Sequence, residues 1–284
     1  MSKLRLILTL GLVLTAFAAN SVLCRMALAH TAIDPAAFTL TRIASGALML
    51  VALTRLTRAE GGISGSWPGA AALLIYATCF SFAYVSLSSG AGALLLFGAV
   101  QATMILRALW AGEKLSRIQW LGLGLALGGL VALMAPGVTA PEPLGAALML
   151  AAGVAWGAYS VLGRAPKTSA MGATAGNFLR ALPLAALVAA ATMAVRPMVW
   201  DQTGLVYALA SGAFASGIGY ALWYAALPSL NASSAASLQL SVPVITAAGG
   251  AIVLGEEITL RLCLASVTVL GGIALVVRAK LRRI

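Results

Sequence analysis

Aromatic and amide side chains recur on the apolar segments of this 284-residue chain, and their types suggest binding chemistry. Tyr76, Phe80 and Tyr84 are spaced four residues apart, so they share one face of a helix. Gln101 and Gln239 lie in apolar runs, where an amide facing lipid is costly and is expected to face a cavity or another helix. The candidate substrate-binding residues are Asn20, Tyr76, Phe80, Tyr84, Gln101, Trp156, Tyr159, Ser160, Tyr220, Trp223, Tyr224, Ser237 and Gln239.

An alternative interpretation is that these aromatics pack the core or form a belt at the membrane surface. Aromatic and amide residues recur on corresponding segments of both halves of the chain, which favours a shared pocket. Stacking surfaces with a few oriented polar groups suit a neutral or zwitterionic molecule with an apolar body. Aromatic or large aliphatic amino acids fit that description.

Two arginines lie within apolar runs, at equivalent places in the two halves. Arg42 follows Phe38, and Arg180 follows Phe178. An arginine in such a run must snorkel, pair, or face a wet cavity. Two interpretations stay open here: snorkelling toward the membrane surface, and attraction of a substrate carboxylate.

The sequence offers little for catalysis. It has no phosphate-binding G-x-x-x-x-G-K-[ST] motif, and its single histidine, His30, has no second metal ligand nearby. We therefore expect no metal, no cofactor and no enzyme. All acidic residues fall in predicted loops or helix ends, which argues against a buried carboxylate for proton exchange or cation binding. These residues are Asp34, Glu60, Glu113, Glu142, Asp201, Glu256 and Glu257.

Composition points to lipid as the solvent. Apolar residues make up 61% of the chain and charged residues 9%, whereas a soluble domain carries about 25% charged residues. The net charge of +11 lies in short clusters at the ends of apolar runs, so it does not predict a nucleic-acid surface. The expected partners are the bilayer and a small-molecule substrate.

Apolar runs bounded by Gly, Pro or charge predict ten transmembrane helices in an all-α membrane protein. Pro183 and Pro243 lie inside runs and are expected to kink or interrupt them. The predicted helices lie near 4–28, 36–56, 68–87, 91–111, 117–135, 143–163, 171–195, 203–226, 233–254 and 260–279.

The distribution of Lys and Arg predicts the orientation. With a cytoplasmic N-terminus, the outer side holds only Arg25, Arg196 and Arg261, which satisfies the positive-inside rule. Both termini are then cytoplasmic, and we expect the cell inner membrane. The residues on the predicted inner side are Lys3, Arg5, Arg55, Arg58, Lys114, Arg117, Arg164, Lys167, Arg278, Lys280, Arg282 and Arg283.

Two stretches occur twice, about 140 residues apart. The segment 17–25, ending Ser-Val-Leu-Cys-Arg, returns as 156–164, ending Ser-Val-Leu-Gly-Arg. Gly112-Glu113 returns as Gly255-Glu256, and each Glu is expected to cap or pin a turn. The chain therefore divides into two five-helix repeats, 1–138 and 139–284. An odd number of spans inverts the second repeat, which is the architecture of secondary transporters with a midplane site. Because one chain supplies both repeats, we expect a monomer.

Ten helices in two halves, each closing with a Gly-Glu turn before a helix that carries Gly128-Gly129 or Gly271-Gly272, resemble the EamA type of the drug/metabolite transporter superfamily. The aromatic-rich central helices resemble YddG-type exporters of aromatic amino acids. The resemblance implies export of small metabolites by alternating access. Other drugs or metabolites are alternative substrates. A polytopic enzyme acting on lipid-linked substrates and a channel are the competing classes.

Overall fold

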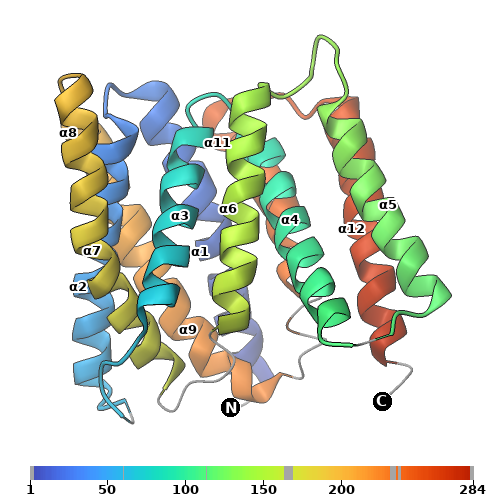
Figure 1. Ribbon diagram of the computed structural model, residues 1–284, viewed down its shortest axis with the longest axis horizontal. Helices are drawn as coiled ribbons and strands as arrows, with labels where there is room; N and C mark the ends of the chain where they lie inside the picture. Colours follow the sequence, from blue (N-terminus) through green and yellow to red (C-terminus); the bar gives the residue numbers. More distant parts are fainter. Residues whose placement is uncertain are drawn as a thin grey trace.

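A computed structural model describes residues 3–59, 61–112, 114–162, 169–230, 235 and 238–281. The described chain is all-helical, and its helices stand side by side (Figure 1). The elements are α1 (Lys3–His30), α2 (Pro35–Leu56), α3 (Trp67–Ala83), α4 (Ser89–Trp110), α5 (Arg117–Met134), α6 (Pro143–Leu162), α7 (Ala170–Val195), α8 (Gln202–Leu209), the π-helix η1 (Ala210–Ile218), α9 (Gly219–Ala226), the 3-10 turn η2 (Leu227–Ser229), α11 (Val242–Leu254) and α12 (Leu260–Leu281). Because α8, η1 and α9 form one continuous span, the predicted ten-helix membrane fold is confirmed.

Local sequence explains where most helices begin. A Ser or Asp side chain accepts a hydrogen bond from a backbone N–H of the first turn, which pairs a donor that the helix itself leaves unpaired. Pro35 and Pro68 follow two of these caps, at positions where proline needs no N–H partner. The capping residues are Asp34, Ser66, Ser88, Ser116, Ser169 and Asp201.

The outside of the bundle is apolar, as expected of a surface that faces lipid. Eight helices are long and apolar enough to cross a membrane, and α3 and α11 are shorter apolar helices. Leu48, Val131 and Ile252 are 73%, 70% and 84% exposed. A soluble monomer rarely leaves so many large apolar side chains in contact with water. The protein is a multi-pass membrane protein.

Helix contacts follow a regular pattern across the two predicted halves. α2 packs against α7, α4 against α11, and α5 against α12. α1 packs against η1 and α9, while α3 packs against α6. Each of the first five spans can be matched with the span five places later, so that α1 corresponds to α6 and α2 to α7. Exchanging every span for its match then gives the same set of five contacts. α1 begins and α12 ends at the same edge of the bundle (Figure 1).

Two features depart from uninterrupted α-helices. η1 is a π-helix in the middle of the eighth span, and no sequence pattern predicted it. The ninth helix was predicted to begin near residue 233. Its α-helical part α11 begins at Val242, with Pro243 in the first turn. Pro243 therefore interrupts its run as predicted, whereas Pro183 is accommodated within α7.

Glycines allow α5 and α12 to approach at the backbone. A Cβ on Gly122 would lie 2.5 Å from the carbonyl oxygen of Gly272, and a Cβ on Gly272 would lie 2.5 Å from that of Gly122. A Cβ on Gly124 or Gly128 would meet nothing within 4 Å, so these two glycines face away from this contact. None of the described cavity-lining residues comes from α5 or α12.

Candidate functional site

A cavity of about 510 Å³ lies between the two predicted halves. Its lining comes from α1, α3 and α4 of the first half and α6, α7, η1, α9 and the segment before α11 of the second. Its volume is in the range of small-molecule sites. Eleven of the candidate residues line it: Asn20, Tyr76, Phe80, Gln101, Trp156, Tyr159, Ser160, Tyr220, Trp223, Tyr224 and Gln239.

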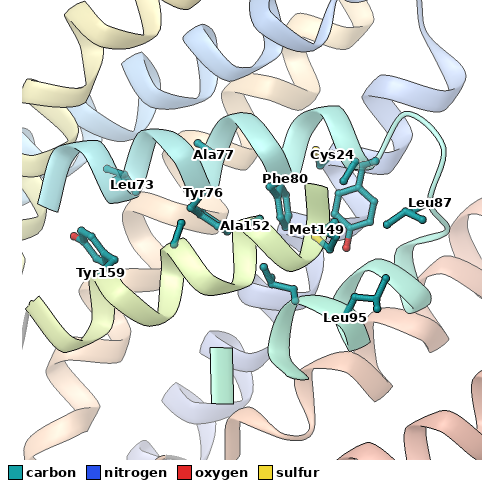
Figure 2. Packing of buried hydrophobic residues seen from close by; sticks show 14 of the residues in the cluster. Cys24, Leu73, Tyr76, Ala77, Phe80, Leu87, Leu95, Met149, Ala152 and Tyr159 are labelled. Atoms are coloured by element: carbon teal, nitrogen blue, oxygen red, sulfur yellow. The ribbon is translucent and has the colours of Figure 1, made fainter. Parts of the chain in front are cut away.

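Stacked aromatic rings form one wall of the cavity. The indole of Trp156 lies nearly parallel to the rings of Tyr159 and Tyr220, with centroids 5.1 and 5.6 Å away and interplanar angles of 19° and 18°. Tyr76, from the first half of the chain, contacts the same indole, with ring centroids 4.7 Å apart. In Figure 2, Tyr76 and Phe80 project from α3 toward α6, which carries Ala152. This wall offers a broad apolar face to a substrate.

Hydroxyl and amide groups of the second half form a hydrogen-bond network beside this wall. The Tyr159 hydroxyl donates to Thr174 Oγ1 at 3.3 Å and accepts from Asn177 Nδ2 at 3.3 Å. Thr174 Oγ1 also lies 2.7 Å from the hydroxyl of Tyr224. Asn177 Oδ1 accepts from the backbone N–H of Ser66 at 2.7 Å, which ties α7 to the start of α3.

Sequence reasoning missed several lining residues. Thr174 and Asn177 line the cavity, as do Phe17 and Ser21. Asn177 carried a usable signal, because an amide in an apolar helix follows the same rule that selected Gln101. Phe17 and Ser21 lie one helical turn from Asn20 or next to it, within the repeated segment.

Arg42 lies in the centre of the bundle, behind the cavity lining. Its side chain is 2% exposed, so it does not snorkel. Nη2 donates to the hydroxyl of Tyr76 at 3.0 Å, and the guanidinium carbon is 4.8 Å from the ring centroid of Phe80. Asn20 Nδ2 donates to the same Tyr76 hydroxyl at 3.4 Å, and Ser211 of η1 donates to Asn20 Oδ1 at 2.7 Å.

Three other candidates lie elsewhere. Arg180 does not line the cavity; its Nη1 donates to the backbone carbonyls of Ser64 and Gly176. Tyr84 is fully buried beyond the cavity, packs edge-to-face on Phe80, and donates to the carbonyl of Ser89 at 3.2 Å. Ser237 lies outside the described residues, as do Arg164 and Glu113.

An ion pair lies at the edge of the bundle where α1 and α11 end. Arg25 Nε lies 3.2 Å from Glu256 Oε1, and Arg25 Nη1 donates to the carbonyl of Val85 at 2.9 Å. Glu256 Oε2 accepts from the backbone N–H and the hydroxyl of Ser89 at 2.8 and 2.5 Å. Gly255, with a left-handed φ of 66°, ends α11 and turns the chain so that Glu256 reaches α4. Glu256 thus pins a turn, as predicted for it.

The cavity lies toward the other edge, where α1 begins. It is lined by the last turns of α6 and the first turns of α7, which meet at that edge (Figure 1). None of its described lining residues is charged. No group of three His, Cys, Asp or Glu side chains that could hold a metal occurs in the part of the chain that the structure describes. The arrangement is suited to holding an uncharged or zwitterionic organic molecule.

Comparison with known proteins agrees with this geometry. Residues 143–278 match the EamA-like transporter family. The chain is 52% identical over 280 residues to an uncharacterized protein of Pseudomonas aeruginosa, with 98% of this chain and 96% of that protein covered. It is 27% identical over 206 residues to an uncharacterized transporter of Archaeoglobus fulgidus, covering 72% and 74%. A solved crystal structure shares the fold at a TM-score of 0.65 and 22% identity, covering 94% of this chain and 97% of that one.

Proposed function

This chain belongs to the EamA-like transporter family, and we propose that it exports zwitterionic amino acids with aromatic or large apolar side chains. The observation that carries the proposal is the neutral, aromatic-lined cavity between the two halves. Trp156 and its flanking tyrosines supply a stacking surface for an apolar body. Gln101 and Gln239 supply polar groups that orient the molecule.

The mechanism we propose is alternating access by two inverted five-helix repeats, 1–138 and 139–284. The exchangeable helix contacts support this division, because a pseudo-twofold axis relates such repeats. With both termini cytoplasmic, as the Lys and Arg distribution predicts, the cavity lies toward the cytoplasm and the Arg25–Glu256 pair closes the outer end. This state would load substrate for export from the cell across the inner membrane. One chain supplies both repeats, so a monomer is sufficient.

Uptake of labelled phenylalanine, tryptophan and leucine into liposomes with the purified protein tests the proposal, with and without a pH gradient. A carrier gives saturable uptake and exchange of internal for external amino acid. Linear, non-saturating flux would instead identify a channel, and chemical alteration of the substrate would identify an enzyme. Saturable transport of other drugs or metabolites, with no amino acid transported, would support a carrier mechanism but reject amino acids as its substrates.

The closed outer end provides a separate test of alternating access. Glu256→Gln removes one charge of the ion pair with Arg25, and a hydrogen bond to a charged group contributes roughly 1.5–3 kcal/mol. We expect several-fold faster labelling, from the outside, of a cysteine introduced at cavity-lining Ser21. Arg261→Gln, in which the altered side chain binds only backbone carbonyls at Ala135 and Pro136, is the matched control. Equal labelling in both variants would mean that the ion pair does not hold the outer end closed.

A further inference from the structure

Arg42 is a permanent cation enclosed in the bundle, with no anionic partner among the described residues. None of the described acidic side chains forms an ion pair with it, and its Nη1 has no hydrogen-bond partner among the described residues. A buried charge within a membrane is expensive unless something compensates it, and such residues mark functional sites. The faces of Phe80 and Tyr76, 4.8 and 5.2 Å from the guanidinium carbon, offset only part of that cost. This part of the bundle therefore favours the approach of a negative charge.

The hydrogen bonds around Tyr76 show where that charge would be received. The Tyr76 oxygen accepts from Arg42 Nη2 at 3.0 Å and from Asn20 Nδ2 at 3.4 Å. Ser211 donates to Asn20 Oδ1 at 2.7 Å, which leaves the amide nitrogen of Asn20 facing Tyr76. A phenolic oxygen has two lone pairs and one proton. Both lone pairs are occupied, so the proton is the one hydrogen-bonding group that the hydroxyl has left, and no described residue accepts it.

Tyr76 lines the cavity, so the unused proton is available to a bound molecule. A hydroxyl whose oxygen already accepts from a cation is a stronger donor, because chains of hydrogen bonds polarise one another. Its best acceptor is an anionic oxygen, since charge-assisted hydrogen bonds are about twice as strong as neutral ones. The described lining residues carry no competing charge.

We propose that the Tyr76 hydroxyl, held and polarised by Arg42, is the docking point for the carboxylate of the transported molecule. Arg42 is a positioning residue that does not touch the substrate. It acts through its hydrogen bond to Tyr76 and through the positive electrostatic potential of its guanidinium, which lies behind the ring of Phe80. The site selects molecules that bear a carboxylate and rejects amines of the same shape that lack one. This inference rests on the proposed function only in taking this cavity as the binding site.

Three probes of one shape test the inference: phenylalanine, 3-phenylpropanoate, which lacks the amine, and phenethylamine, which lacks the carboxylate. Binding to the purified protein is measured from the concentration dependence of its melting temperature. Wild-type protein is expected to bind the two carboxylates at least 10-fold more tightly than phenethylamine. Tyr76→Phe, which removes only the hydroxyl, should weaken both carboxylates about 10-fold or more, as expected for a lost hydrogen bond to a charged group, and leave phenethylamine unchanged.

Tyr84→Phe is the matched control. Tyr84 lies beyond the cavity and its hydroxyl donates to the carbonyl of Ser89, so this variant should change carboxylate binding by about twofold or less. Asn20→Asp is a second variant. Its carboxylate would accept the Tyr76 proton and place a negative charge beside the Tyr76–Arg42 pair, so it should remove the preference for carboxylates. Equal losses in Tyr76→Phe and Tyr84→Phe, equal affinity for phenethylamine and the two carboxylates, or no binding by any probe would overturn the inference.

The same probes separate this inference from the proposed function. Tyr76-dependent binding of 3-phenylpropanoate, with no transport of amino acids into liposomes, would support the carboxylate site and reject the amino-acid substrate class. Equal transport of phenylalanine by wild type and Tyr76→Phe would support amino-acid transport and reject the carboxylate site.

Discussion

Arg42 in α2 and Arg180 in α7 occupy corresponding sequence positions on two helices that pack together, yet their surroundings differ. Arg180 is half-buried and donates to two backbone carbonyls, of Ser64 and Gly176. Arg42 is fully buried, donates to one phenol, and keeps a nitrogen with no partner among the described residues. The two halves of the chain therefore share an arginine in sequence but use it differently. Arg180 joins a loop to a helix, and Arg42 places a charge behind the cavity.

The tyrosines near the two arginines differ in the same way. On the Arg180 side, the Tyr159 proton is taken up by Thr174. On the Arg42 side, the Tyr76 oxygen only accepts among the described residues. An asymmetric site of this kind can hold the two ends of a zwitterion differently, which a strictly symmetric site could not do.

Replacing Arg42 should have the largest effect. Arg42→Ala removes the donor and the charge that support Tyr76, and loss of a charged hydrogen bond costs roughly 1.5–3 kcal/mol, or about 10- to 150-fold. We expect that loss in the kcat/KM for transport of a carboxylate-bearing substrate, measured in liposomes at matched protein content. Arg180→Ala, measured alongside, should stay within about twofold; comparable losses in both variants would erase the functional difference between the repeats.

Replacing Phe80, whose ring faces the guanidinium of Arg42, should have an intermediate effect. Phe80→Leu removes a cation–π contact with Arg42, which is worth about 0.5–2 kcal/mol, and should lower carboxylate transport roughly 3- to 30-fold. Phe178→Leu is the counterpart near Arg180. No cation–π contact with Phe178 occurs among the described residues, so its effect on transport should be about twofold or less. If Phe178→Leu were the more damaging of the two, aromatic packing would explain both variants better than charge.

Arg180→Ala should have the smallest effect on transport and act on stability instead. It breaks the hydrogen bond to Ser64 that ties α7 to the loop before α3, together with a bond to Gly176 within α7. The cost is about 1–2 kcal/mol, which corresponds to a melting temperature lower by about 2–8 °C. The measurement is a thermal melt of the purified protein. An unchanged melting temperature together with lost transport would reverse the roles assigned to the two arginines.

Much of the fold was predictable because membrane helices are long apolar runs with local end signals. Prolines and capping Ser or Asp residues define most helix starts, as at Asp34 and Ser66. Part of the candidate site was predictable from the spacing of side chains along a helix. Tyr76 and Phe80 lie four residues apart, share one helix face, and both line the cavity. Tyr84 continues that spacing but follows the last residue of α3, where the chain turns, so it packs behind Phe80.

Other features depend on tertiary contacts that no local pattern encodes. Spacing could not show that Arg42 is enclosed while Arg180 reaches a loop, because that difference depends on which neighbours each side chain meets. Thr174 takes part in the site through Tyr159 and Tyr224, which lie on two other helices. The π-helix η1 packs closely against α2, since a Cβ on Gly212 would collide with the carbonyl oxygen of Arg42.

η1 also sets the direction in which the side chains that follow it in the eighth span point around the helix axis. A π-helical turn accommodates one additional residue, and each residue of an α-helix advances the side chains by about 100°. Without that residue, Tyr220, Trp223 and Tyr224 would be carried around the helix axis, away from the cavity they now line.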